Sequence, residues 1–310
     1  MNKESGRPLL IVITGPTATG KTRLAACVAA KLNGEVISAD SRQVYRGMDI
    51  GSGKDLADYI VEDVRIPYHL VDIANPGEEY NVYAFQKDFV NRYNDIIKRN
   101  KQPVLCGGTG LYVEAAVSGY RLLKVPENQK LRDELSKKTM PEMVEMLAGI
   151  KKMHNITDTT DRARLVRAIE IATYEAEHRE LMMDYPVFDH KLFAIHFERS
   201  VLRERITARL KQRLAEGMVD EVKQLLQGGL EPAQLMFYGL EYRYLTMYVK
   251  GVISYDAMFE KLNTAIHQFA KRQMTWFRRM ERKGFNIHWI DGNKNLEAKI
   301  HEVLITLESE

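Results

Sequence analysis

A phosphate-binding loop is indicated near the start of the chain, where residues 15–22 read GPTATGKT. This matches the pattern G-x-x-x-x-G-K-[ST], which is significant when a strand precedes it and a helix follows it. Apolar residues predict the strand over 9–13, and a helical pattern predicts the helix over 22–32. Backbone N–H groups of such a loop surround a di- or triphosphate, a lysine neutralises it, and a hydroxyl binds Mg²⁺. The candidate phosphate-binding residues are Gly15, Pro16, Thr17, Ala18, Thr19, Gly20, Lys21 and Thr22, with Thr22 as the metal ligand.

A carboxylate, Asp40, ends a second predicted strand over residues 35–40. The polar residues Ser41, Arg42 and Gln43 follow it. Because the carboxyl ends of parallel strands border the ligand crevice of an open α/β sheet, Asp40 there would hold a metal or accept a proton. An aspartate that only caps the next turn is the alternative.

Two further segments bear on the same chemistry. Gly107-Gly108-Thr109-Gly110 follows a strand predicted over 103–106, so its small residues and the Thr109 hydroxyl would lie at the same sheet edge. An ordinary strand-to-helix turn has the same composition. Asp72 follows the apolar pair Leu70-Val71 and is the other carboxylate that a nucleotide hydrolase would need after a strand.

Arginines cluster on two predicted helices. Arg164 and Arg167 lie three residues apart on a helix predicted from Asp161 to Glu175, where a solvated face is the usual explanation. A later helix carries an apolar face that repeats every four residues and a separate basic row. That row consists of Arg205, Arg209 and Arg213.

These loops require an α/β fold with a parallel sheet flanked by helices, and the pattern of the chain fits one. Strand and helix signals alternate up to about residue 118, and strand runs then disappear until 191–197. We therefore predict a phosphate-loop core formed by residues 1–118 and 190–310, with a helical insertion at 119–189.

Composition narrows the class of protein. Of the 310 residues, 45% are hydrophobic and 28% are charged, a composition typical of a folded chain rather than a disordered one. The net charge is only +3, so any basic surface must be local. Two cysteines exclude a disulfide scaffold or a Cys-rich zinc module. No segment approaches the roughly 18 apolar residues of a membrane span. We expect a monomeric cytoplasmic protein that does not bind membranes.

Several tracts together resemble the tRNA dimethylallyltransferases, also called tRNA isopentenyltransferases or the IPP transferase family. In chain order they are GPTATGKT at 15–22, ISADSRQVYRGMDIGSGK at 37–54, YHLVDI at 68–73, VLCGGTGLYV at 104–113, DRARLVRAIEI at 161–171 and FAKRQMTWFR at 269–278. The resemblance implies transfer of a dimethylallyl group from dimethylallyl diphosphate to N6 of the adenine 3′ to the anticodon, position 37, with Mg²⁺ as cofactor.

The resemblance also implies roles for individual residues. Asp40 matches the general base that accepts the N6 proton, and Thr109 and Arg209 match residues that contact the diphosphate, so these three are the catalytic candidates. The insertion is expected to bind the anticodon stem-loop, where arginine binds phosphate without reading sequence. The tRNA-binding candidates are Asp40, Ser41, Arg42, Gln43, Thr109, Arg132, Arg164 and Arg167.

The chain departs from the family pattern in three places. Asp55 follows Lys54 where the family usually has proline, residues 173–180 read TYEAEHRE, and residues 237–241 read FYGLE instead of IGYKE.

Two other functions are compatible with a phosphate loop. A prenyltransferase acting on free adenylate would not need the arginine-bearing insertion, and an RNA-binding ATPase would need a clearer acidic strand end than this sequence has.

Overall fold

The computed structural model describes residues 8–150, 161–181 and 185–309. The chain divides into two compact units, one formed by Met1–Gly119 with Val187–Glu310 and the other by Tyr120–Pro186. The expected borders, 118/119 and 189/190, lie within a few residues of this division. Each unit is described by itself below.

A six-stranded parallel sheet forms the centre of the first unit, in the order β5-β2-β6-β1-β7-β8. Its middle strands β1, β2 and β6 are almost entirely buried because both faces of the sheet are covered. The predicted α/β fold with a parallel sheet is therefore confirmed. The strands are β1 Leu10–Thr14, β2 Gly34–Ser38, β5 Tyr68–His69, β6 Gln102–Gly107, β7 His190–His196 and β8 Ile287–Asp291.

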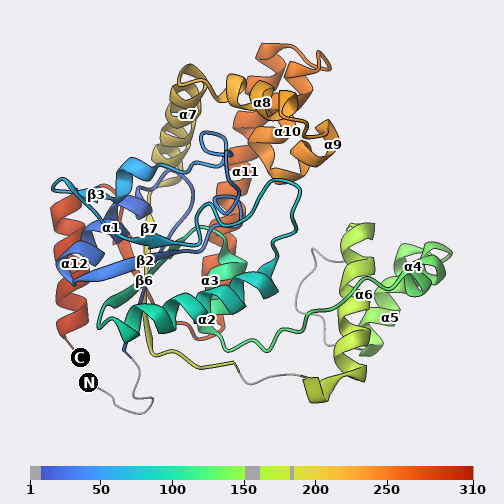
Figure 1. Cartoon of the computed structure of the whole chain (residues 1–310), viewed down its shortest axis with the longest axis horizontal. Helices are drawn as coiled ribbons and strands as arrows, with labels where there is room; N and C mark the ends of the chain where they lie inside the picture. Colours follow the sequence, from blue (N-terminus) through green and yellow to red (C-terminus); the bar gives the residue numbers. More distant parts are fainter. Residues whose placement is uncertain (1–7, 151–160, 182–184, 310) are drawn as a thin grey trace. The chain divides into compact units, whose positions relative to one another are not determined.

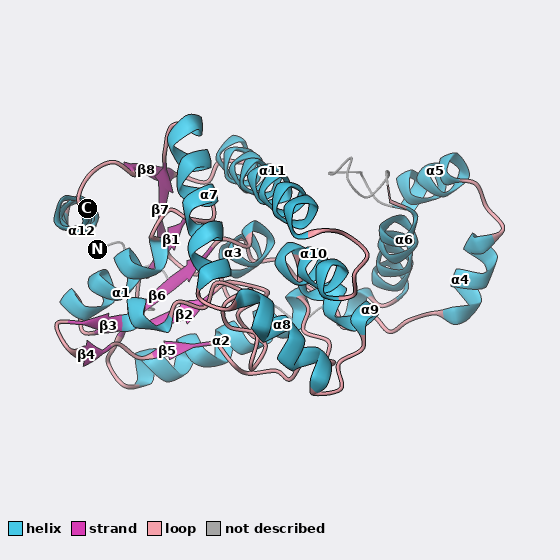
Figure 2. Ribbon diagram, turned by 90° about the horizontal axis from the view of Figure 1, so that it is seen from above, coloured by secondary structure: helices cyan, strands magenta, loops and turns pink. Residues whose placement is uncertain are grey.

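Helices cover both faces of this sheet (Figures 1 and 2). On one face, α1 (Lys21–Lys31) and α12 (Leu296–Glu308) share a core with the strands, to which Leu24 and Val303 contribute fully buried side chains. Against the sheet also lie α2 (Val82–Lys98) and α3 (Gly110–Val117). Their aromatic rings Phe85 and Tyr112 stack at 4.3 Å between centroids.

The remaining helices of the first unit form a second core. The predicted four-residue repeat is confirmed, since Leu202, Ile206 and Leu210 are all buried there, against Met258 and Leu262. These helices gather around α7 and α11 (Figure 1). They are α7 Arg199–Ala215, α8 Met218–Gln227, α9 Pro232–Leu235, η4 Met236–Tyr238, α10 Leu240–Val249 and α11 Tyr255–Arg282.

The segment between β2 and α2 differs from the sequence prediction. Strand β5 ends at His69, and Leu70 and Asp72 have φ angles of 61° and 55°, so no strand leads into Asp72. A short helix, η1 (Leu56–Tyr59), and a hairpin of β3 (Ile60–Val61) and β4 (Val64–Arg65) precede β5. The hairpin turn has positive φ at Glu62 and Asp63, without the Asn-Gly pair that usually marks such turns.

The second unit is helical. Its helices α4 (Gln129–Ser136), α5 (Met140–Ile150) and α6 (Arg162–Glu177) enclose a small core, and η3 (Arg179–Leu181) follows them. Side chains of Asn128 and Asp161 cap α4 and α6 by accepting backbone N–H groups. The core residues are Leu135, Met143, Leu147, Leu165, Ile169 and Ala172. In the described part of the chain, no helix is long and apolar enough to cross a membrane.

Candidate active site

Three loops meet at the carboxyl edge of the sheet, where β1, β2 and β6 lie side by side. The Thr14 hydroxyl donates to the carbonyl of Gly107 at 2.7 Å. The N–H of Ala39 donates to Cys106 at 2.7 Å, and the N–H of Thr109 donates to Ala39 at 3.3 Å. These hydrogen bonds bring three loops together: the phosphate loop, the loop after Asp40 and the glycine loop. The sequence predicted that all three follow strands at the same edge of the sheet.

The phosphate loop has positive φ angles at two of its glycines, which glycine adopts without strain. Gly15 has φ 147°, and a Cβ there would lie 2.8 Å from the carbonyl of Ile195. Gly20 has φ 78°, and α1 begins at Lys21. The Lys21 ammonium donates to the carbonyl of Pro16 at 3.2 Å, so it is folded back over the loop.

Removal from water lowers the pKa of Lys21. Nearby Arg209 and Arg213 lower that pKa further, whereas Cys106 and Asp40 raise it. The loop therefore lies among several cations and one carboxylate. An anion placed there would relieve the repulsion among the cations.

Asp40 lies in the loop after β2 and takes part in a turn. Its Oδ1 accepts the backbone N–H of Arg42 at 3.0 Å, which is the turn-forming contact that we considered as the alternative. The next residue, Ser41, donates its N–H to the Thr109 hydroxyl at 3.1 Å. The structure thus brings Asp40, Ser41 and Thr109 together, and the remaining oxygen capacity of the carboxylate is available to a ligand.

The other two residues of that tract face different partners. Arg42 pairs with Glu241 at 3.0 Å and lies over the ring of Phe269. Gln43 donates to the carbonyl of Gly53 at 3.0 Å. Both side chains therefore hold neighbouring segments of the first unit in this structure.

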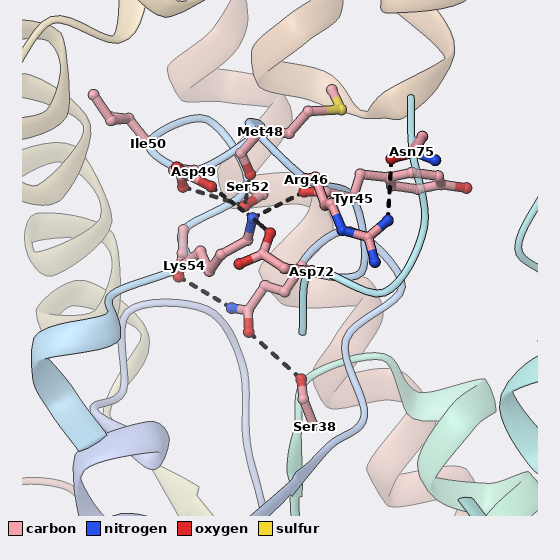
Figure 3. Close-up of polar contacts among 12 residues, drawn as sticks. Ser38, Tyr45, Arg46, Met48, Asp49, Ile50, Ser52, Lys54, Asp72 and Asn75 are labelled. Carbon is pink, nitrogen blue, oxygen red and sulfur yellow. Dashed lines mark hydrogen bonds and ion pairs between the residues drawn. The ribbon is translucent and has the colours of Figure 1, made fainter. Parts of the chain in front are cut away.

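Two anchors fix the segment that runs from Tyr45 to Lys54. The Lys54 side chain is fully buried, and its ammonium contacts the Tyr45 carbonyl at 2.8 Å, Asp49 at 2.6 Å and Asp72 (Figure 3). This pairing gives Asp72 a structural partner in place of the metal-binding role that a hydrolase would need.

The second anchor is the Glu221 carboxylate of α8. It accepts the N–H groups of residues 49, 50 and 51 at 2.9, 2.7 and 3.0 Å. The Tyr242 hydroxyl donates to the same carboxylate at 2.8 Å. Charge-assisted bonds to three consecutive amides hold this part of the chain firmly.

Gln273 joins two loops of the candidate site, and the sequence analysis did not single it out. It is 7% exposed, and its Oε1 accepts the N–H of Thr17 at 3.0 Å while its Nε2 donates to the carbonyl of Gly108 at 2.7 Å. One carboxamide thus joins the phosphate loop to the glycine loop. The tract AKRQ carried this residue, but no local pattern shows that a glutamine 256 positions away binds Thr17.

The basic row of α7 lies against the phosphate loop. Arg205 Nε donates to the carbonyl of Ala18 at 3.0 Å, and both Arg209 and Arg213 pair with Asp55. Burial lowers the pKa of Arg209, as does the neighbouring Arg213, and Asp55 opposes them. A small cavity between the loop and α7 is lined by Thr17, Ala18, Ile206, Arg209, Leu210, Arg213, Met218, Glu241 and Ile266.

In the second unit, two of the three candidate arginines have structural partners. Arg132 forms a two-bond pair with the fully buried Glu170 at 2.8 and 3.0 Å, and Arg167 contacts the same carboxylate at 3.0 Å. Arg167 also donates to the carbonyl of Val125 at 2.7 Å. Arg164 is exposed. Binding of tRNA by these residues remains a prediction.

A Mg²⁺ site is compatible with this arrangement. The described residues contain no group of three or more His, Cys, Asp or Glu side chains that could hold a metal ion. Mg²⁺ commonly uses one or two protein oxygens together with substrate phosphates and water. The Thr22 hydroxyl at the start of α1 would be such an oxygen, and the phosphates of a ligand would supply others.

Comparison with known proteins identifies the family. The IPP transferase model matches residues 43–280, and an isopentenyl transferase model matches residues 8–71. tRNA dimethylallyltransferase 2 of Bacteroides fragilis is 54% identical over 294 residues, or 95% of this chain and 96% of that protein. tRNA dimethylallyltransferase 1 of Parabacteroides distasonis is 51% identical over 97% of this chain and 98% of that protein.

Solved structures agree with the sequence comparisons. The tRNA isopentenylpyrophosphate transferase of Bacillus halodurans superposes with a TM-score of 0.71 at 31% identity, covering 97% of this chain and 96% of that one. A eukaryotic dimethylallyltransferase acting on tRNA gives 0.74 at 25% identity, covering 92% of this chain and 74% of that one. With most of its length matched in sequence and in structure, the chain belongs to the IPP transferase family.

Proposed function

We propose that this protein transfers the dimethylallyl group of dimethylallyl diphosphate to N6 of adenine 37 in tRNA, next to the anticodon, and releases diphosphate. The observation that carries the proposal is the junction of Asp40, Thr109 and the phosphate loop at one sheet edge. The relatives that match nearly the whole chain are tRNA dimethylallyltransferases, which supports dimethylallyl as the transferred group and tRNA as the acceptor.

The reaction forms a bond between N6 and the allylic carbon and breaks the bond between that carbon and the diphosphate oxygen. The lone pair of N6 is delocalised into the adenine ring, so the amine reacts slowly unless it is positioned and its proton is removed. In this proposal, Asp40 is the carboxylate that accepts that proton. Bound Mg²⁺ would neutralise charge on the phosphate oxygens.

Charge that develops on the departing diphosphate needs fixed donors. The loop amides and the Lys21 ammonium supply them at the N-terminus of α1, and the Thr109 hydroxyl and the Arg209 guanidinium extend the set. All of these groups belong to one chain, so we expect a monomer to be active. We expect the enzyme in the cytoplasm, together with its tRNA.

The test is incubation of the purified protein with dimethylallyl diphosphate, Mg²⁺ and either total tRNA or AMP, followed by mass spectrometry of the nucleosides. Prenylated adenosine in tRNA alone is the expected result. Product in AMP alone would establish the adenylate prenyltransferase instead. In competition, dimethylallyl diphosphate should displace a bound donor analogue far better than ATP. Ready ATP hydrolysis without binding of the prenyl donor would contradict the proposal.

A further inference from the structure

One carboxylate is shared by two arginines of α7. Arg209 and Arg213 lie one turn apart, and both guanidiniums pair with Asp55, in the case of Arg213 at 3.3 Å. The side chains of Arg209 and Arg213 are only 30% and 12% exposed, whereas that of Asp55 is 45% exposed. Two largely desolvated cations therefore depend on a carboxylate that water reaches.

The position of Asp55 is fixed by its surroundings. It directly follows the buried Lys54, and its N–H donates to the carbonyl of Gly53 at 3.1 Å. Gly53 has φ 75°, and a Cβ there would lie 2.6 Å from Arg213 Nη2, so the absence of a side chain makes room for that guanidinium. Asp55 precedes η1 without capping it through its side chain, which instead contacts the arginines.

The same arginines face the phosphate loop. Arg209 and Arg213 line a cavity together with Thr17 and Ala18. Guanidinium groups bind carboxylate and phosphate oxygens with the same forked geometry, so a diphosphate in the loop and the Asp55 carboxylate are competing partners for them. Arginine side chains are long and flexible, whereas the backbone at Asp55 is anchored. The exchange therefore requires movement of the guanidiniums alone.

We propose that Asp55 is the resident counter-anion of Arg209 and Arg213, and that the diphosphate of the substrate takes its place when it binds. This inference rests on the proposed function, because it takes a diphosphate as the ligand of the loop. Asp55 offsets part of the charge of the arginine pair in the free enzyme, and it pairs with both arginines again when the diphosphate leaves. It thereby weakens the binding of both donor and product.

The test uses inorganic diphosphate with Mg²⁺ as the probe, titrated calorimetrically into the full-length protein. Asp55→Asn keeps an oxygen that accepts from the arginines but removes the charge, so the Kd for diphosphate should fall by roughly 3- to 10-fold. Asp63→Asn is the matched control, because Asp63 is exposed in the next turn and has a positive φ that asparagine tolerates. Its Kd should equal that of the wild type.

A double-mutant cycle localises the effect. In an Arg213→Gln background, Asp55→Asn should tighten diphosphate binding by a smaller factor, because one of the two competed cations is gone. An unchanged or higher Kd for Asp55→Asn, in a variant that melts as the wild type does, would mean that Asp55 orients the arginines for the ligand and would overturn this inference alone. Failure of the wild type to bind diphosphate would overturn the proposed function and this inference together.

Discussion

Asp40 forms a turn contact in this structure and is the proposed general base, and a pair of substitutions separates these two roles. Asp40→Asn retains an oxygen for the Arg42 N–H but cannot accept a proton, and Asp40→Ala removes both functions. We expect turnover to fall by roughly 10²–10⁴-fold in both variants, with donor affinity nearly unchanged. Single-turnover assays and donor titrations provide the two readouts. Wild-type turnover in Asp40→Asn would leave the residue with the turn alone.

Lys54 contacts Tyr45, Asp49 and Asp72, and it therefore affects the candidate site by anchoring the segment that follows Asp40. Lys54→Met would leave Asp49 and Asp72 without their shared cation, and because both carboxylates are partly exposed, we expect a loss of about 1–3 kcal/mol in the free energy of unfolding. The segment that follows Asp40 would loosen, so turnover should fall as well.

Thermal and urea unfolding measure this effect. Adding Asp72→Asn to the Lys54→Met variant should restore part of the stability, because one uncompensated carboxylate is removed. An unfolding free energy equal to that of the wild type in the single variant would contradict the anchoring role.

At the scale of elements, α11 joins two loops of the site through Gln273. Gln273→Met fills a similar volume but loses the bonds to Thr17 and Gly108, so we expect a roughly tenfold loss in kcat/KM for the donor. Because the Thr17 N–H and the Gly108 carbonyl lose their partner, we also expect a loss of about 1–3 kcal/mol in the free energy of unfolding. Gln268→Met is the matched control, since Gln268 is exposed on the same helix. Steady-state kinetics decide the question, and equal values for the two variants would remove Gln273 from the site.

The elements were largely predictable because their signals are local. The apolar run of β1, the glycines of the phosphate loop and the four-residue repeat of α7 each lie within a short window. The prediction for the tract around Leu70 was wrong because an apolar pair predicts a strand, whereas Leu70 and Asp72 adopt left-handed backbone conformations. The contacts of Gln273 with the phosphate loop and of Asp55 with α7 were beyond prediction, because they join segments far apart in sequence.

At the scale of the whole molecule, the second unit depends on one buried carboxylate. Burial alone would raise the pKa of Glu170, but bonds from Arg132, the Asn128 N–H and Arg167 lower it to about 2. Because the folded pKa lies below the ordinary value of 4.5, the stabilisation is complete above that pH and is lost as the pH falls toward 2. Glu170→Gln should therefore destabilise α4 and α6 at neutral pH.

Hydrogen exchange of the α4 and α6 amides tests this pH dependence. The difference between wild type and Glu170→Gln should be largest near pH 7 and should shrink steadily below pH 4.5. A difference independent of pH would mean that the charge of Glu170 does not stabilise the unit.

Recognition of tRNA by the whole molecule is best tested at Arg164. Replacing Arg164 and Arg167 together would also break the contact of Arg167 with Glu170, so a loss of binding would mix RNA contact with damage to the unit. Arg164 is exposed, and Arg164→Ala should make the log–log salt slope of tRNA binding shallower by about 0.9, the value of one duplex phosphate contact. The KM for tRNA should rise more than kcat falls, while Arg164→Lys, which keeps the charge, should retain the wild-type slope.

Filter binding over a range of KCl concentrations measures the slope. If Arg164→Ala and the wild type have the same slope, Arg164 belongs to a solvated face and contacts no phosphate.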